Sequence, residues 1–134
     1  MRDPSVTVTA KGLYFDKTAI KTLDMAVYVD IRFDPAAKVL IVYPSCVQDE
    51  RHIRWAVEKE GSICPMHIAW DTASCFDTMG WNNQWRYRSI GTPGDDDGRE
   101  CLIFLLEYSM TYVPETLRMR SAAKQIRMVT SEVE

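Results

Sequence analysis

Side chains able to carry out catalysis are scarce in this 134-residue chain, and their spacing matches no common reaction centre. His52 and His67 are the two histidines that could act as bases, and no Gly-x-Ser-x-Gly turn supplies a nucleophile beside them. The segment Gly91-Thr92-Pro93-Gly94 is not followed by the lysine and the helix that a phosphate-binding loop requires. We therefore expect a protein that is not an enzyme and that uses no cofactor.

Four possible zinc ligands lie within a short window and form the strongest metal candidate. Their spacing, Cys-x5-His and then Cys-x2-His, matches no common zinc finger, because closed zinc sites usually contain tighter cysteine pairs. We predict reduced thiols and no metal, and whether the four side chains meet in space stays open. The four residues are Cys46, His52, Cys64 and His67.

An alternation of aromatic and basic residues, Trp85-Arg86-Tyr87-Arg88, is the clearest candidate for a binding surface. In a strand, the two aromatic rings would lie on one face and the two arginines on the other. The rings are expected to fill the core, while the arginines, with a basic C-terminal segment, could form a positive face that contacts phosphates. The predicted nucleic-acid or partner contacts are Arg86, Arg88, Arg118, Arg120, Lys124 and Arg127.

The acidic run Asp95-Asp96-Asp97 is the alternative contact site, expected in an exposed hairpin loop over residues 91–98. An acidic surface can mimic nucleic acid or block the basic groove of another protein. The run lacks the spaced ligands and the final glutamate of a calcium loop, so a solvated turn is the other interpretation. The partner contacts in this alternative are Asp95, Asp96 and Asp97.

The charge balance restricts the possible partners. The net charge of −3 does not support nucleic-acid binding by the whole chain, so that role would require a local basic face. Apolar residues make up 46% of the sequence and charged residues 26%, which is typical of a globular protein with one core. We find no signal peptide and no apolar run long enough to span a bilayer. A cytoplasmic protein without membrane contact is expected.

The elements that would position these residues begin with a unit of about residues 6–44. Asp16 is placed to cap a helix over residues 17–23, because its carboxylate can accept the free amide hydrogens of the first turn. Apolar and polar residues then alternate over residues 27–33, which predicts a strand, and a turn leads to a return strand over residues 39–43.

A looser copy of this unit covers about residues 63–110. Asp71 is the expected cap of a helix over residues 72–79, which ends at Gly80, and strands over residues 85–90 and 101–110 follow. Both units have the order β-α-β-β, so we predict a structural repeat, although two chance copies of a common pattern are the alternative. Between them, residues 53–57 are expected to form a strand.

The end of the chain differs from both units. Pro114 and Glu115 indicate the start of a helix, and apolar and basic residues then alternate as in an amphipathic helix. We therefore predict one domain over residues 1–113 and a basic C-terminal helix over residues 114–134. That helix would pack on the domain or on a second subunit, which could give a homodimer.

The stretch GLYFDKTAIKTLDMAVYVDIRFDPAAKVLIVYP resembles the swapped-hairpin unit of AbrB/MazE-type proteins. In that family, two units make one barrel, so a chain with two copies could close the barrel alone. The resemblance implies an α+β fold with two β-α-β-β pseudo-repeats in a compact AbrB-like barrel. It also implies DNA binding, although of the helices in the two units only the first carries basic residues, Lys17 and Lys21.

Three stretches resemble small uncharacterised proteins of prophages and conjugative elements in Gram-positive bacteria. They are VTAKGLYFDKTAIKTL, YVDIRFDPAAKVLIVYPSC and CPMHIAWDTASCFDTMGWNNQWRYRSIG. With the absence of catalytic residues, this resemblance leads us to expect an accessory protein of a mobile element that binds DNA, or the recombinase or regulator acting on it. The alternative is a phage-type inhibitor, similar to an anti-CRISPR or other anti-defence protein, that binds a host defence protein such as a nuclease through its acidic surface.

Overall fold

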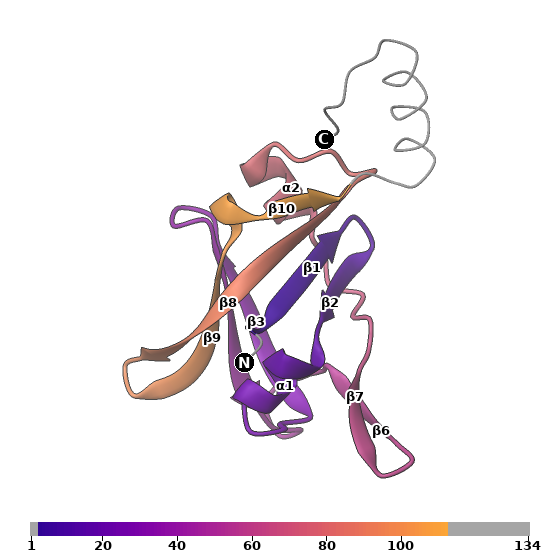
Figure 1. The fold of residues 1–134 in the computed structure, drawn as a ribbon. Helices are drawn as coiled ribbons and strands as arrows, with labels where there is room; N and C mark the ends of the chain where they lie inside the picture. Colours follow the sequence, from indigo (N-terminus) through magenta and orange to yellow (C-terminus); the bar gives the residue numbers. More distant parts are fainter. Residues whose placement is uncertain (1–2, 113–134) are drawn as a thin grey trace.

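Most strands belong to one antiparallel sheet that curls into a half barrel (Figure 1). The computed structural model describes residues 3–112. Within them, the strand order is β2-β1-β8-β9-β4-β3-β5, and β10 also pairs with β8. These strands are β1 (Ser5–Thr9), β2 (Gly12–Phe15), β3 (Tyr28–Asp34), β4 (Val39–Ser45), β5 (Ile53–Arg54), β8 (Arg86–Asp96), β9 (Arg99–Leu105) and β10 (Met110–Tyr112). The predicted α+β class is confirmed.

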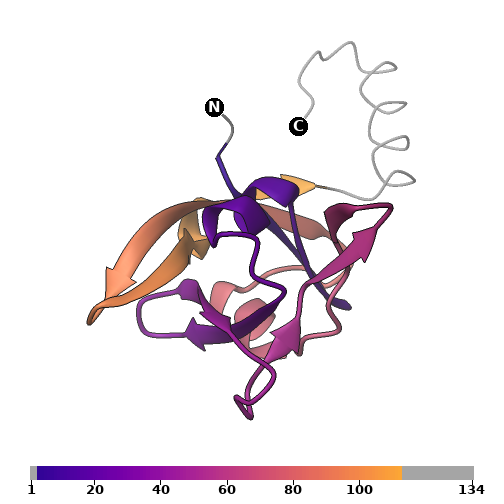
Figure 2. The same ribbon diagram turned by 90° about the horizontal axis from the view of Figure 1, so that it is seen from below.

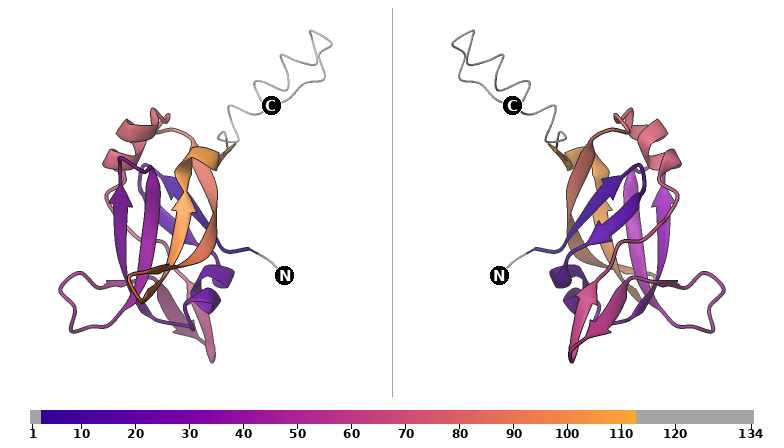
Figure 3. Two further views of the ribbon diagram at one scale, coloured as in Figure 1. Left: turned by 90° about the vertical axis from the view of Figure 1, so that its left-hand side faces the viewer. Right: turned by 90° about the vertical axis from the view of Figure 1, so that its right-hand side faces the viewer.

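The remaining elements lie around this sheet. They are α1 (Lys17–Thr22), β6 (Ala56–Lys59), β7 (Ser62–Pro65), α2 (Ala73–Met79) and the 3-10 helix η1 (Leu106–Tyr108). The two α-helices lie at opposite ends of the sheet (Figure 3), and the β6–β7 and β8–β9 hairpins project on opposite sides (Figure 2). The curved wall of the half barrel is therefore formed by strands alone.

The first helix is capped as predicted. Asp16 Oδ1 accepts hydrogen bonds from the backbone N–H groups of Ala19, at 2.9 Å, and Ser5, at 3.1 Å. Asp16 Oδ2 accepts a third from Ser5 Oγ at 2.9 Å. One carboxylate therefore starts α1 and also fixes that helix to β1.

The second helix starts one residue later than predicted. Its N-cap is Thr72, not Asp71, although Asp71 Oδ1 accepts a hydrogen bond from the N–H of Ala73 at 3.0 Å. The Thr72 hydroxyl makes no cap hydrogen bond, because it donates instead to the carbonyl of Thr9 at 2.7 Å. Gly80 ends the helix in a left-handed conformation with φ of 66°, as the sequence predicts.

The core lies on the concave face of the sheet and is centred on aromatic rings. Trp55 is fully buried, and its Nε1 donates to the carbonyl of Ala26 at 2.7 Å. The Phe15 ring contacts Trp55 and Phe104 edge-on, with centroid distances of 5.1 and 5.7 Å. The three rings come from different parts of the chain and form one cluster. The core therefore connects β2, β9 and the β5–β6 segment.

The longest strand, β8, has different neighbours along its two halves. Residues 86–90 lie beside β1 and β10, whereas residues 91–96 pair with β9. Gly91 lies at the junction between these two halves. The ring of Phe104 fills the space that a side chain at position 91 would need. A Cβ atom at Gly91 would lie 2.5 Å from Phe104 Cε2. Glycine is therefore required where β8 passes from one part of the sheet to the other.

The predicted loop over residues 91–98 is wrong. β8 continues to Asp96, and the hairpin turn is only Asp97 and Gly98, whose φ angles are 56° and 82°. Two residues with positive φ make the turn type that best joins twisted antiparallel strands. Pro93 is compatible with a strand here because β9 pairs with one side only, and proline is tolerated on an open edge.

Two further strand predictions need correction. The strand expected over residues 53–57 is interrupted at Trp55, whose N–H donates to the carbonyl of Val27 while its ring enters the core. The strand expected over residues 101–110 spans 99–105, since η1 then turns the chain and β10 returns along β8. The predicted C-terminal helix and its homodimer contact lie outside the described residues.

Candidate binding site

The predicted aromatic and basic strand forms from Arg86 onward, whereas Trp85 lies in a bend before it, and the structure describes only part of the predicted positive face. Tyr87 is buried and its ring stacks on Trp81, with a centroid distance of 4.1 Å and an interplanar angle of 4°. Arg86 is exposed and Arg88 half-buried, opposite Tyr112 and Met110 of β10. The remaining four predicted contacts lie outside the described residues, and they are Arg118, Arg120, Lys124 and Arg127.

The acidic run lies at the tip of the β8–β9 hairpin, and two of its carboxylates have structural partners. All three side chains belong to exposed residues. Asp95 Oδ1 accepts a hydrogen bond from the N–H of Gly98 at 2.7 Å, and Asp96 Oδ2 accepts one from the Tyr43 hydroxyl at 2.5 Å. Asp97 occupies the first turn position. The run is therefore partly a structural feature of this hairpin.

A cluster around Tyr43 covers the convex face of the sheet near that tip. The guanidinium carbon of Arg99 lies 4.2 Å from the centroid of the Tyr43 ring, and that of Arg32 lies 5.8 Å away. The hydrogen bond to Asp96, together with burial, raises the pKa of Tyr43 to about 12. The hydrogen bond from Tyr43 to Asp96 links the two hairpins.

A second cluster, around Asp30 of β3, was not predicted from the sequence. The Asp30 side chain is 2% exposed, and its Oδ2 accepts hydrogen bonds from Arg32 Nη2 at 2.9 Å and Arg32 Nε at 3.1 Å. Arg51 Nε lies 3.5 Å from Asp30 Oδ1, which has no hydrogen-bond partner among the described residues. The interaction with Asp30 raises the pKa of Arg32. Asp30 lies beside both guanidinium groups, and the nearby Asp49 carboxylate also raises the pKa of Arg32, so two carboxylates and two guanidinium groups share this cluster.

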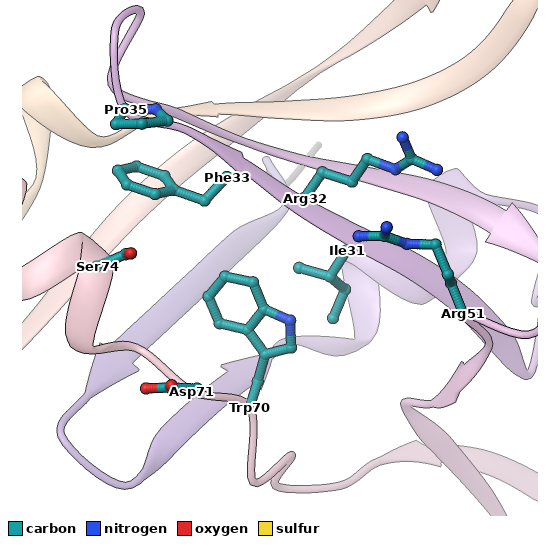
Figure 4. Close-up of a pocket in the computed structure, with 8 residues that line it drawn as sticks. All are labelled: Ile31, Arg32, Phe33, Pro35, Arg51, Trp70, Asp71 and Ser74. Carbon is teal, nitrogen blue, oxygen red and sulfur yellow. The ribbon is translucent and has the colours of Figure 1, made fainter.

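Beside this cluster, a groove of about 480 Å³ separates β3 from the segment that enters α2 (Figure 4). Figure 4 shows Pro35 toward one end of the groove and Arg51 toward the other, with the Trp70 ring facing Ile31. The lining residues are Ile31, Arg32, Phe33, Pro35, Arg51, Trp70, Asp71 and Ser74. The groove therefore combines an apolar floor with positively charged groups at one end.

The β3 side of the groove is an open sheet edge. On this side, β5 pairs only with Tyr28 and Val29, and the carbonyl of Val27 accepts the N–H of Trp55 at 3.1 Å. Since peptide groups alternate in direction along a strand, those of Ile31 and Phe33 point to the same side as that of Val27. The groups that point toward β4 are then those of Asp30 and Arg32, and within residues 3–112 no backbone hydrogen bond outside the strand ladders involves Ile31 or Phe33. The groove therefore contains four unpaired backbone groups.

The four possible zinc ligands do not form a site in the described part of the chain. Among residues 3–112, no group of three or more histidine, cysteine or acidic side chains is arranged to hold a metal ion. Cys46 is exposed, and the ring of His52 lies against Tyr28 with Nδ1 at 2.6 Å from the carbonyl of Asp49. The His52 ring therefore has a local structural role in this loop.

Comparisons with protein-family models, with curated proteins and with solved structures find no match for this chain. Within the described residues, no helix has the length and apolar character needed to cross a membrane. Function is therefore inferred from the geometry and charge described above.

Proposed function

We propose that this chain is a non-enzymatic accessory protein of a mobile genetic element that binds a DNA-acting protein, such as a recombinase or a regulator. Charge is the observation that carries this proposal. Residues 3–112 contain 11 lysines and arginines against 16 aspartates and glutamates, a net charge of −5. Such a body repels phosphates and attracts the basic surfaces that are typical of DNA-acting proteins.

The sheet supports the further proposal of two related units in an AbrB-like barrel. β4 and β9 are the return strands of the two predicted units, and they pair antiparallel with Ile41 opposite Ile103. The strand order β8-β9-β4-β3 places the two hairpins side by side through their return strands, which supports a pseudo-two-fold arrangement of the two units. The resemblance of both units to mobile-element proteins supports the biological setting.

Direct binding of DNA receives less support from the described residues. The two predicted contacts on β8, Arg86 and Arg88, have no other lysine or arginine directly opposite them, because their neighbours are Thr7, Met110 and Tyr112. Two arginines alone give few phosphate contacts, and affinity for DNA rises with the number of such contacts. A protein partner is therefore the preferred form of the proposal.

The proposal is tested by capturing the tagged full-length chain from cells that carry the element, with and without nuclease treatment of the lysate. We expect a DNA-acting protein to remain bound after DNA and RNA have been digested. In parallel, fluorescence anisotropy with a random duplex at about 50 mM and about 200 mM salt should show no binding, whereas phosphate-mediated binding falls steeply over this range.

Loss of the captured protein on nuclease treatment would contradict a protein partner. So would salt-dependent DNA binding that disappears in the double variant Arg86→Gln and Arg88→Gln. The matched control is Lys59→Gln, which removes an exposed charge on β6, at a distance in sequence and sheet from β8.

An anti-defence inhibitor is the second candidate function, and the exposed acidic tip of the β8–β9 hairpin favours it. The hairpin projects from the body (Figure 1), so its carboxylates could enter a basic groove of a defence protein. The double variant Asp95→Asn and Asp97→Asn removes two charges and leaves the bond between Asp96 and Tyr43 in place. Inhibition of the defence system should fall at least about tenfold, and unchanged inhibition would exclude the acidic tip as its cause.

A further inference from the structure

We propose that the open edge of β3 binds an extended segment of the partner protein, which adds to the sheet as a short strand with an apolar–acidic–apolar sequence. This inference rests on the proposed function, because it requires a protein partner. It specifies where that partner binds and which side chains it presents.

The unpaired backbone of β3 is the first reason. Ile31 is only 3% exposed, yet its N–H and C=O have no hydrogen-bond partner within residues 3–112, and the same is true of Phe33. Peptide groups in such positions are nearly always paired in native proteins. An added antiparallel strand would supply the missing partners, with one guest residue opposite Ile31 and another opposite Phe33 exchanging two bonds each.

The ends of the groove set the length of the guest. β5 already occupies the edge at Val29, and Pro35 has no N–H to offer beyond the other end. The free edge is therefore limited to residues 30–34. A guest segment of about three to five residues fits this edge, at roughly 3.4 Å per residue.

The two faces of the added strand determine its sequence. Guest residues opposite Ile31 and Phe33 would point to the concave face, where Trp70 forms the facing wall, so apolar side chains are expected there (Figure 4). The guest residue between them would lie opposite Arg32, on the convex face where Arg51 also approaches Asp30. A glutamate or aspartate at this position could pair with the exposed guanidinium groups of Arg32 and Arg51, as opposite charges favour cross-strand pairing.

A second copy of this chain is a poor guest, because no register of two β3 edges is favourable. Pairing centred on Arg32 places the arginines of both copies directly opposite each other, where like charges repel. Pairing centred on Ile31 requires Val29, which β5 already occupies, and pairing centred on Phe33 requires the N–H that Pro35 lacks. A segment of a different protein is therefore the expected occupant.

A set of synthetic peptides tests the inference on the full-length chain. The probe is acetyl-Thr-Val-Glu-Val-Thr-amide, added to about 2 mM while the backbone amide and indole signals are followed by NMR. We expect shifts at Ile31, Phe33 and Trp70. Replacing the glutamate of the peptide by lysine should weaken binding at least about tenfold, because the charge would then face Arg32 and Arg51.

N-methylation of the peptide distinguishes strand addition from simple adhesion to an apolar groove. Methylation of both valine nitrogens removes the hydrogen bonds to β3 and should abolish binding. Methylation of the glutamate nitrogen, which points away from β3 in the expected register, should weaken binding by less than about threefold. Equal effects of the two modifications would overturn the inference.

Variants of the protein complete the test. Arg51→Gln should weaken peptide binding about threefold to tenfold, whereas Lys59→Gln on β6 should leave it unchanged. If the peptide causes no shifts, or if capture of the cellular partner is equally strong with Arg51→Gln and the wild type, the groove is not the binding site, although the proposed function stands. If no nuclease-resistant partner is captured, the proposed function fails, whether or not the peptide binds.

Discussion

The two hairpins at the centre of the sheet have similar strands but very different outer edges. In the β8–β9 hairpin, the N–H of Gly91 donates to the carbonyl of Pro4 at 2.8 Å, and the next residue whose peptide group points outward is Pro93, which has no N–H. In the β3–β4 hairpin, the corresponding outward groups belong to Ile31 and Phe33 and are unpaired within the described residues. One edge is protected, and the other remains able to accept a strand.

This difference is the basis for the proposed strand addition at β3. Natural sheets protect their edges with prolines, charges or covering segments, because an open edge promotes unwanted pairing. The β8 edge follows this rule with Pro93 and an acidic tip. The β3 edge is bounded by β5 and Pro35, and between them Arg32 disfavours pairing with a second copy while leaving the edge accessible to an acidic segment.

The largest expected effect concerns the support of β3, and the variant is Trp55→Ala. Trp55 is fully buried and hydrogen-bonded to the backbone at Val27 and Ala26, so its removal leaves a large cavity beside the β5 end of the strand. The free energy of unfolding should fall by about 3–5 kcal/mol. Urea denaturation followed by circular dichroism measures the change. A loss below about 1 kcal/mol would show that Trp55 does not hold β5 against β3.

The corresponding test of the β8–β9 hairpin is Gly91→Ala. The added methyl group would overlap the Phe104 ring, whose Cε2 would be 2.5 Å away. The free energy of unfolding should therefore fall by about 1–3 kcal/mol. The matched control is Gly98→Ala, because a Cβ atom at Gly98 would meet no other atom. This control should cost only the backbone strain of an alanine at a φ of 82°, about 1 kcal/mol. If Gly91→Ala is as stable as the wild type, the close contact with Phe104 does not define the junction.

Asp30→Asn tests the charge cluster at the open edge. The change keeps the shape of the side chain but removes the charge that holds Arg32 and Arg51, so we expect a loss of about 1 kcal/mol. The loss is limited because both arginine side chains are about half exposed or more, at 47% and 61%, and regain hydration. Chemical denaturation of wild type and variant in low and high salt gives the comparison. A difference unaffected by salt would argue against an electrostatic role.

The smallest effect is expected for Tyr43→Phe, which removes the hydrogen bond between the hairpins at a cost of about 0.5–1 kcal/mol at neutral pH. The pKa of Tyr43 is about 12 in the folded chain, above the ordinary value of 10.0. The stabilisation is therefore fully present below pH 10 and is lost as the pH rises toward 12, because the unfolded chain loses this proton first. Difference absorbance at 295 nm between wild type and variant measures this titration. A titration of Tyr43 with its midpoint near pH 10 would contradict the hydrogen bond to Asp96.

Local signals in the sequence were sufficient to predict several elements. The Asp16 cap, the alternating strand before Asp34 and the end of α2 at Gly80 all depend on neighbouring residues, and all three are confirmed. The residues of segment 91–96 predict a loop, because glycine, proline and aspartate are typical of turns, but the structure has a strand there. Gly91 fits in β8 because the ring of Phe104 fills the space beside it, and Pro93 fits because that edge of β8 is open. Neither feature can be predicted from the neighbouring residues in the sequence.

The candidate site was beyond sequence reasoning for a similar reason. Arg51 belongs to a polar loop and Trp70 to an extended segment, and only the folding of the sheet brings both to the edge of β3. The alternation of Asp30 and Arg32 with apolar residues identifies β3 as a strand. It carries no information on whether a neighbour covers the edge of that strand, because pairing is decided by the length of β5.

Amide hydrogen exchange at Ile31 and Phe33 tests the central claim most directly. In the free chain, both amides should exchange rapidly compared with those of Asp30 and Arg32, which pair with β4. Saturation with the Val-Glu-Val peptide should slow exchange of Ile31 and Phe33 at least about tenfold and leave Asp95 unchanged. Slow exchange of both amides in the free chain, or no protection by the peptide, would contradict an open edge that accepts a strand.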